Sequence, residues 1–214
     1  MTKIDEKFVF EPTAFDYVNQ KAEVVIVGIT PGNSQLDGSR EGMSPREIKR
    51  KFAFAGSMRP NLVKMLDYIG VNRRLGIASC STLWEEDFDR VDMTSLLVEA
   101  TYERKKDGTK EMFRHAQKIA KSEKLTRMLE EGFVKNSSRY ENTVLYVACG
   151  LGVYDVLKGL LAEQKIKGQA VAIAHPSGAN MKCIQCYLGR KEPSTLSLQK
   201  YVEKAQEAKE IVGR

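Results

Sequence analysis

The sequence predicts an α/β fold of three layers, α/β/α, with a central parallel sheet of about four strands. Apolar, β-branched runs of the kind found in buried parallel strands occur at 23–28, 143–149 and 170–174. Weaker strand candidates lie at 76–79 and 91–94. Helical patterns separate these runs, and such alternation favours a doubly wound sheet, whose ligands bind beyond the carboxyl ends of the strands.

Helix signals are clearest where a cap accompanies an apolar repeat. Ser44 to Glu47 reads as a capping box with proline at the first helical position. The stretch from Pro60 carries apolar residues on one face and stops at Gly70. Similar patterns predict helices over 109–131, 153–162 and 194–212, whereas the basic segment 102–108 is expected to be a loop.

The composition is that of a single globular domain over residues 1–214. Apolar residues make up 42% and charged residues 29%, which supports a sizeable core and argues against disorder. No apolar run approaches the roughly 18–20 residues that span a bilayer, and the polar N-terminus lacks a signal-peptide stretch. We therefore expect a cytoplasmic protein without membrane association, and we expect it to act as a monomer.

The chain is basic, with 34 Lys and Arg against 28 Asp and Glu and a formal net charge of +6. This balance favours a polyanionic partner such as nucleic acid, although many basic proteins bind none. The basic residues are dispersed, with modest local excesses at 49–51 and 104–106. Each of these clusters is by itself more typical of a solvated face.

Four cysteines raise the question of a metal or redox site. Cys183 and Cys186 form a CxxC pair, which is compatible with a zinc half-site, a redox pair or no site at all. Cys80 and Cys149 lie in apolar runs and are expected to be small buried residues. Because one pair alone does not complete a metal site, we expect neither a metal nor another cofactor.

A glycine-rich loop follows the clearest strand directly. From Gly28 it reads Gly-Ile-Thr-Pro-Gly-Asn, so that Thr30 precedes proline and Gly32 precedes Asn33. Glycine at a strand end lets a ligand approach the backbone, and Pro31 restricts Thr30 to an extended conformation. The spacing is that of neither a dinucleotide-binding loop nor a Walker loop, and alone it is typical of an ordinary turn.

A second polar loop, His-Pro-Ser-Gly-Ala-Asn over 175–180, follows the last strand. His175 is one of only two histidines, and at a strand end its imidazole can donate a hydrogen bond to an anion that forms in the cleft. Ser177 offers a hydroxyl to a phosphate oxygen. Taken alone, a histidine at a strand end is a structural residue about as often as it is a functional one.

Together, the two loops resemble the signature loops of the uracil-DNA glycosylase superfamily, in which a strand precedes Gly-x-x-Pro-Gly and a later strand precedes His-Pro-Ser. Further resemblance lies in segments 52–62, 91–96 and 147–150, so that it covers roughly residues 20 to 190. The resemblance implies a glycosylase-like fold. It also implies an enzyme that acts on DNA, single- or double-stranded, and hydrolyses the N-glycosidic bond of uracil or a related deaminated base after flipping it out.

The resemblance also implies roles for individual residues. His175 would stabilise the negative charge on the departing base, while Thr30 and Asn33 would orient the attacking water. The other residues to which the resemblance gives a role contact the flipped base, the DNA phosphates or the stack of bases. They are Gly28, Ile29, Gly32, Phe54, Thr94 and Ser95 around the base, and Ser177, Ala179, Asn180 and Met181 at the phosphates and the wedge into the stack.

Two departures from the family pattern keep other functions open. Thr30 stands where many members carry aspartate or asparagine, and threonine cannot act as a base near pH 7. Ala179 stands where a leucine usually wedges into the stack, which leaves Met181 as the substitute. His175 favours a base-excision glycosylase and Thr30 a module that binds nucleic acid without cutting it, while a third alternative is an unrelated α/β enzyme acting on a small nucleotide.

Overall fold

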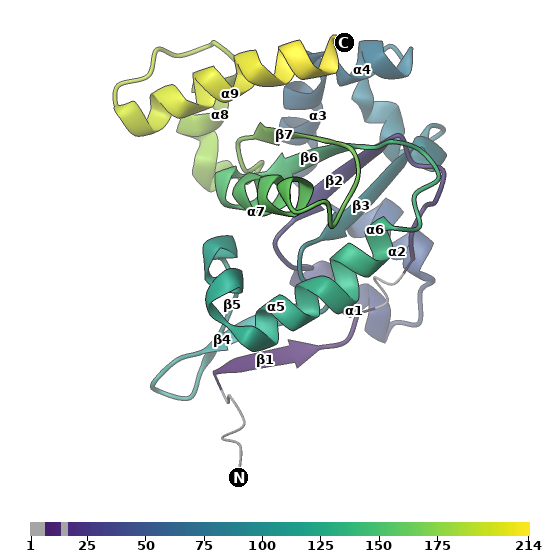
Figure 1. Cartoon of the computed structure of the whole chain (residues 1–214), viewed down its shortest axis with the longest axis vertical. Coiled ribbons are helices and arrows are strands. Elements are labelled where there is room, and N and C mark those ends of the chain that lie inside the picture. The colour runs from purple at the N-terminus through teal and green to yellow at the C-terminus, as the bar shows by residue number, and fades with distance from the viewer. Residues whose placement is uncertain (1–6, 14–16) are drawn as a thin grey trace.

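The computed structural model describes residues 7–13 and 17–214, with the backbone alone at 39 and 40, and forms a layered α/β molecule (Figure 1). Its central sheet contains β2 (Val24–Gly28), β3 (Val91–Ser95), β6 (Leu145–Cys149) and β7 (Gln169–Ile173). All neighbours pair in parallel, in the order β3-β2-β6-β7. The predicted four-stranded parallel sheet is therefore confirmed.

Five helices cover the two faces of this sheet: α3 (Met58–Ile69), α5 (Glu123–Leu129), α7 (Leu151–Ala162), α8 (Met181–Tyr187) and α9 (Leu196–Val212). Successive strand residues point to opposite faces. Val24 and Ile26 join the core beneath α3, α8 and α9, whereas Val25 and Val27 join the core beneath α5 and α7. Each face thus has its own apolar layer, which confirms the α/β/α arrangement.

Local signals placed several helices correctly. At the start of α2 (Pro45–Phe52), Ser44 accepts from the Glu47 N–H, and the Glu47 side chain accepts from the Ser44 N–H at 2.9 Å. Gly70 ends α3 in the left-handed conformation, with φ 88°. The repeats at 153–162 and 194–212 correspond to α7 and α9. By contrast, the strand predicted at 76–79 is wrong, because Gly76 instead caps the short helix before it.

A hairpin replaces the loop predicted at 102–108 and the first residues of the helix predicted over 109–131, which is helical only from Ala116 onward. β4 (Ala100–Arg104) and β5 (Lys110–Met112) pair antiparallel, and β1 (Phe8–Glu11) completes a small sheet in the order β1-β4-β5. Gly108, with φ 85°, turns the chain between β4 and β5. Phe113 then packs edge-on against Phe8, with ring centroids 5.8 Å apart, which anchors the hairpin to β1.

Shorter elements complete the fold: α1 (Asn33–Arg40), α4 (Val71–Leu75), α6 (Lys135–Ser137), the 3₁₀ turns η1 (Cys80–Trp84), η2 (Phe88–Arg90), η3 (Ala116–Lys121) and η5 (Gly178–Asn180), and the π-helical turn η4 (Glu130–Val134). Within the described residues, no helix has the length and apolar character required to cross a membrane.

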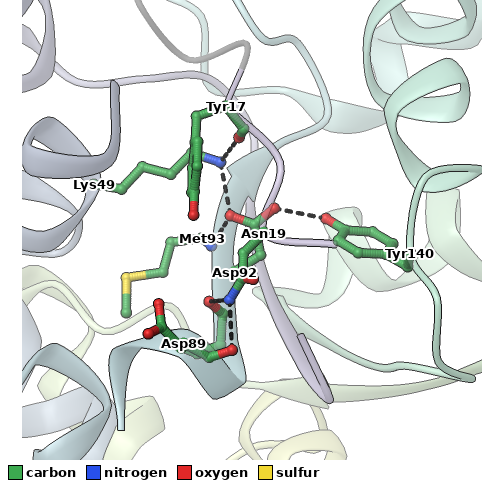
Figure 2. Close-up of polar contacts among 8 residues, drawn as sticks. Tyr17, Asn19, Lys49, Asp89, Asp92, Met93 and Tyr140 are labelled. Carbon is green, nitrogen blue, oxygen red and sulfur yellow. Dashed lines mark hydrogen bonds and ion pairs between the residues drawn. The ribbon is translucent and has the colours of Figure 1, made fainter. Parts of the chain in front are cut away.

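A buried ionic cluster fastens α2 to the edge strand β3 (Figure 2). Lys49 Nζ lies 2.7 Å from Asp92 Oδ1, and both side chains are only 1% exposed. The same carboxylate accepts from the Tyr140 hydroxyl at 2.9 Å and from the Met93 N–H at 2.8 Å. Lys49 also donates to the Tyr17 carbonyl. Lys49 is therefore not part of a solvated face, and Asp92 lies near the start of β3, away from the carboxyl ends of the strands.

Candidate active site at the carboxyl edge of the parallel sheet

The strand ends bring the two predicted loops to one edge of the sheet. Gly28 of β2 pairs with Ser95 of β3, and a Cβ added to Gly28 would lie 3.6 Å from Ser95 Oγ. A Cβ added to Gly150, directly after β6, would lie 3.8 Å from the Cβ of His175. Only β6 separates β2 from β7, so the two loops start about 10 Å apart, at two strand spacings.

The first loop is braced against the start of β4. The Thr30 hydroxyl donates to the Glu99 carbonyl and accepts from the Thr101 N–H, both at 2.9 Å. A hydroxyl has one proton and two lone pairs, so Thr30 keeps one lone pair for a water or a ligand. Asn33 begins α1, where its Oδ1 accepts from the Tyr102 hydroxyl at 3.1 Å. Thr30 can therefore orient a water only as a hydrogen-bond acceptor. The side-chain oxygen of Asn33 faces β4.

Two further groups in this loop are already satisfied within the protein. The Ile29 carbonyl accepts from the Leu97 N–H at 2.9 Å, and the Ile29 side chain packs against the core beneath α7. The Gly32 N–H donates to Gln35 Oε1 at 2.5 Å. A base would therefore contact this loop mainly through van der Waals contacts with the loop backbone. The Gly32 N–H could donate to the base only after the Gln35 side chain had moved away.

In the second loop, the backbone sets the tautomer of His175. The Ser177 N–H donates to His175 Nδ1 at 3.3 Å, and Ser177 Oγ lies 3.2 Å from the same atom. An Nδ1 that accepts carries no proton, so the neutral ring carries its proton on Nε2. Burial of the ring lowers the pKa of His175, which favours this neutral form near pH 7. His175 is thus a neutral Nε2–H donor, and Nε2 has no hydrogen-bond partner among the described residues.

The rest of this loop combines bonded polar groups with exposed apolar ones. Asn180 Nδ2 donates to Ser177 Oγ at 2.8 Å, so the Ser177 hydroxyl already contacts both Asn180 and His175. Ala179 is exposed, and Met181 at the start of α8 is 39% exposed. A thioether chain at this rim is long enough to enter a base stack, whereas the methyl group of Ala179 is not.

Helix α3 supports the second loop through a residue to which the sequence analysis gave no role. The side chain of Asn61, in the first turn of α3, is buried and donates through Nδ2 to the Pro176 carbonyl at 3.0 Å. The sequence signal that could have identified Asn61 is its place on the side of the helix that becomes buried. A buried amide there needs a specific hydrogen-bond partner. Asn61 therefore positions the His175 loop without contacting the site itself.

The predicted base-binding side chains differ in how they are placed. Ser95 lies beside Gly28 at the end of β3, whereas Thr94, one residue earlier, points to the opposite face of the sheet. Both are buried. Phe54 precedes α3 with φ 52°, unusual for a residue other than glycine, and its half-buried ring packs against the core beneath α3. Ser95 is therefore the better placed of the two β3 hydroxyls to face a base.

Two hollows lie over the small antiparallel sheet. Asn33, Tyr102 and Lys110 contribute to one of about 370 Å³, next to the first loop. The other, of about 430 Å³, is lined largely by charged residues of the β4–β5 hairpin. Neither of these hollows includes His175. Both hollows therefore belong to the small antiparallel sheet rather than to the His175 loop.

The cysteines are placed mainly as packing residues. Cys80 and Cys149 are buried, as expected, and Cys186 on α8 is fully buried while Cys183 is half-buried. Across residues 7–13 and 17–214, no group of three or more His, Cys, Asp or Glu side chains is arranged to hold a metal ion. The CxxC pair therefore lies on one helix, with its second cysteine inside the core.

Comparisons with known proteins give distant likenesses. No family model matches the chain. It is 27% identical over 192 residues to the uncharacterized protein YoxB of Bacillus subtilis (strain 168), across 83% of this chain and 73% of YoxB. Among solved structures, it is similar to the crystal structure of Pedobacter heparinus SMUG2, with a TM-score of 0.47 and 14% identity across 90% of this chain and 76% of that one.

Proposed function

We propose that the protein is a DNA N-glycosylase that hydrolyses the bond between deoxyribose and uracil or a related deaminated base. The observation that carries the proposal is the hydrogen bond from the Ser177 N–H to His175 Nδ1, which leaves Nε2–H as the donor at the rim of the sheet. As this bond breaks, the base departs with negative charge. A donor held in place before the reaction stabilises that charge at little reorganisation cost.

The chemistry balances with water as the only co-reactant. The C1′–N bond breaks, and its electron pair leaves with the base while positive charge develops on the sugar. A water oxygen then bonds to C1′, its proton passes to solvent, and the base anion is protonated. Thr30 can accept a hydrogen bond from this water through its remaining lone pair. Because Thr30 is no base, stabilisation of the leaving group by His175 carries most of the rate enhancement.

Glycines beside His175 and beside Ser95 support access for a base at this edge. Gly150 follows β6 with φ 108°, a conformation that favours glycine, and Gly28 leaves the space beside Ser95 open. In this proposal a flipped base lies along the row from Ser95 to His175, and Met181 enters the gap in the stack. We further propose that the chain acts as one domain and a monomer, in the cytoplasm and without a cofactor.

A binding module without catalysis is the second candidate. The observation that favours it is that the Thr30 hydroxyl proton is committed to the Glu99 carbonyl, and residues 28–33 contain no carboxylate. Such a module would bind DNA through the same edge and leave the glycosidic bond intact.

An excision assay separates the two candidates. Labelled oligonucleotides containing uracil, hypoxanthine or xanthine, single- and double-stranded, are incubated with protein and then treated with alkali to break abasic sites. The glycosylase proposal expects cleavage at one or more of these bases, and its loss in the His175→Ala variant. Binding without cleavage of any of them would support the binding module instead.

A further inference from the structure

The β4–β5 hairpin carries a cluster of cations that the proposed chemistry does not use. They line a hollow of about 430 Å³, called here the basic hollow, which consists of Lys7, Glu103, Arg104, Lys105, Lys106, Glu111, Met112, Arg114 and His115. Counting Lys and Arg against Glu gives five positive and two negative side chains around it. A concave surface with this excess attracts anions.

The two glutamates organise these cations without neutralising them. Each carboxylate faces two basic side chains, and the neighbouring cations lower the pKa of both Glu103 and Glu111, so both are ionised at neutral pH. One negative charge shared by two cations leaves a positive charge available to a ligand. The pairs are Glu103 with Lys7 (3.4 Å) and Lys118 (3.0 Å), and Glu111 with Lys105 (2.8 Å) and Arg114 (4.0 Å).

The turn that carries Lys105 and Lys106 is built by specific hydrogen bonds. The Asp107 carboxylate accepts from the Thr109 N–H at 2.9 Å and from the Thr109 hydroxyl at 2.6 Å. The Lys105 N–H closes the turn on the Thr109 carbonyl at 2.7 Å. Gly108 supplies the left-handed residue that this turn requires. The cations are thus presented on a defined turn, which lowers the entropy lost when they bind a ligand.

Strand β4 connects the candidate active site to the basic hollow. Thr101 of β4 donates to Thr30 in the first loop, and Arg104 lies three residues further along the same strand. Three strand residues span about 10 Å, which places the hollow within a few nucleotides of the first loop. Figure 1 shows the hairpin projecting from the sheet at the end opposite α4.

We propose that the basic hollow binds the phosphodiester backbone of the DNA strand, a few nucleotides away from the base held at His175. The inference deepens the proposed function and rests on it. Its ligand is phosphate in a polynucleotide rather than free phosphate, because the cations are divided between two carboxylates, with Lys7 at Glu103 and Lys105 and Arg114 at Glu111, and so offer more than one phosphate contact.

A matched pair of double variants tests this. Lys105→Gln/Lys106→Gln removes two adjacent cations from the basic hollow, and Arg73→Gln/Arg74→Gln removes two adjacent exposed cations from α4 at the opposite end. Binding of an undamaged fluorescent single strand is measured by anisotropy over a range of salt concentrations. If both lysines contact phosphates, the slope of log K against log[salt] should become shallower by about 1.4, at roughly 0.7 per contact. The α4 variant should keep the wild-type slope.

Each outcome separates this inference from the glycosylase proposal. Because the strand is undamaged, a loss of slope in the hairpin variant alone supports the basic hollow whether or not the protein excises bases. Equal slopes in all three proteins would overturn the inference, even for an active glycosylase. Inorganic phosphate is then added at matched ionic strength. Saturable binding of this phosphate to wild type but not to the hairpin variant, together with equal strand slopes in the two proteins, would make the hollow a free-phosphate site and the backbone assignment wrong.

Discussion

The backbone N–H of Ser177 donates to Nδ1 of His175 at 3.3 Å, so the main chain fixes which ring nitrogen keeps its proton. The hydroxyl of Ser177 approaches the same atom, but the N–H survives any substitution except proline. Ser177→Ala should therefore preserve the Nε2–H tautomer and reduce excision far less than His175→Ala does. Single-turnover rates of the two variants check this, and an equal loss in both would assign the tautomer to the hydroxyl.

Protonation of His175 should contribute to the pH dependence of the free energy of unfolding. Burial lowers its pKa in the folded protein below the ordinary value of 6.5. As the pH falls through 6.5, the unfolded chain takes up a proton that the folded protein does not. The free energy of unfolding therefore decreases until the pH reaches the pKa of His175 in the folded protein. Below that pH, this contribution of His175 no longer changes. Urea unfolding at pH 7.5 and pH 5.5 should show the loss in wild type. A His175→Gln variant with the same loss would exclude this origin.

Much of the parallel sheet was predictable because its strands are buried on both faces. Runs such as 23–28 are then continuously apolar, and helices between them are the simplest way to cover both faces. The paired loops were predictable for a related reason, since the carboxyl ends of parallel strands meet at one edge. What could not be predicted was the state of their polar groups. The bonds from Thr30 to Glu99 and Thr101 join positions about 70 residues apart.

The small antiparallel sheet escaped prediction for a different physical reason. Residues 102–112 are mostly charged, and the pairing of β4 with β5 is favoured by the turn at Gly108 rather than by an apolar run. The charges that suggested a loop and a solvated helix instead form cross-strand pairs such as Lys105 with Glu111. Charge alone does not distinguish a helix surface from the exposed face of a hairpin.

Thr30 should have a structural role that can be measured apart from catalysis. Thr30→Val removes the partner of both the Glu99 carbonyl and the Thr101 N–H, which should cost about 1–3 kcal/mol of stability. Thr30→Ser should restore most of it. Denaturant midpoints give the comparison, and a valine variant as stable as wild type would contradict the bracing role.

Thr30→Asp should act in opposite directions on stability and on rate. A carboxylate can still accept from the Thr101 N–H, but it repels the Glu99 carbonyl to which threonine donates. If position 30 contacts the attacking water, the same carboxylate should raise the rate of excision by the folded fraction. Lower stability with an unchanged rate would remove Thr30 from the reaction.

The ion pair beneath α2 should be important for stability because both partners are buried. Lys49→Met leaves the Asp92 charge without its cation, and breaking such a pair typically costs about 3–5 kcal/mol. Adding Asp92→Asn removes the stranded charge while keeping a side chain that can bond Tyr140 and Met93. The double variant should therefore be more stable than Lys49→Met alone in urea unfolding. A double variant that is less stable than Lys49→Met would contradict this account.

The central claim is that His175 acts as a donor to the departing base, and the most direct test is the single-turnover rate of the His175→Ala variant. The substrate is a uracil-containing single strand at saturating protein, with binding of the undamaged strand measured in parallel. Loss of such a donor typically lowers the rate on the order of 100- to 1,000-fold, whereas the affinity for the undamaged strand should be nearly unchanged. His175→Gln, which retains an N–H donor, should recover part of the rate. Full activity in His175→Ala, or no excision of any modified base by the wild type, would contradict the account.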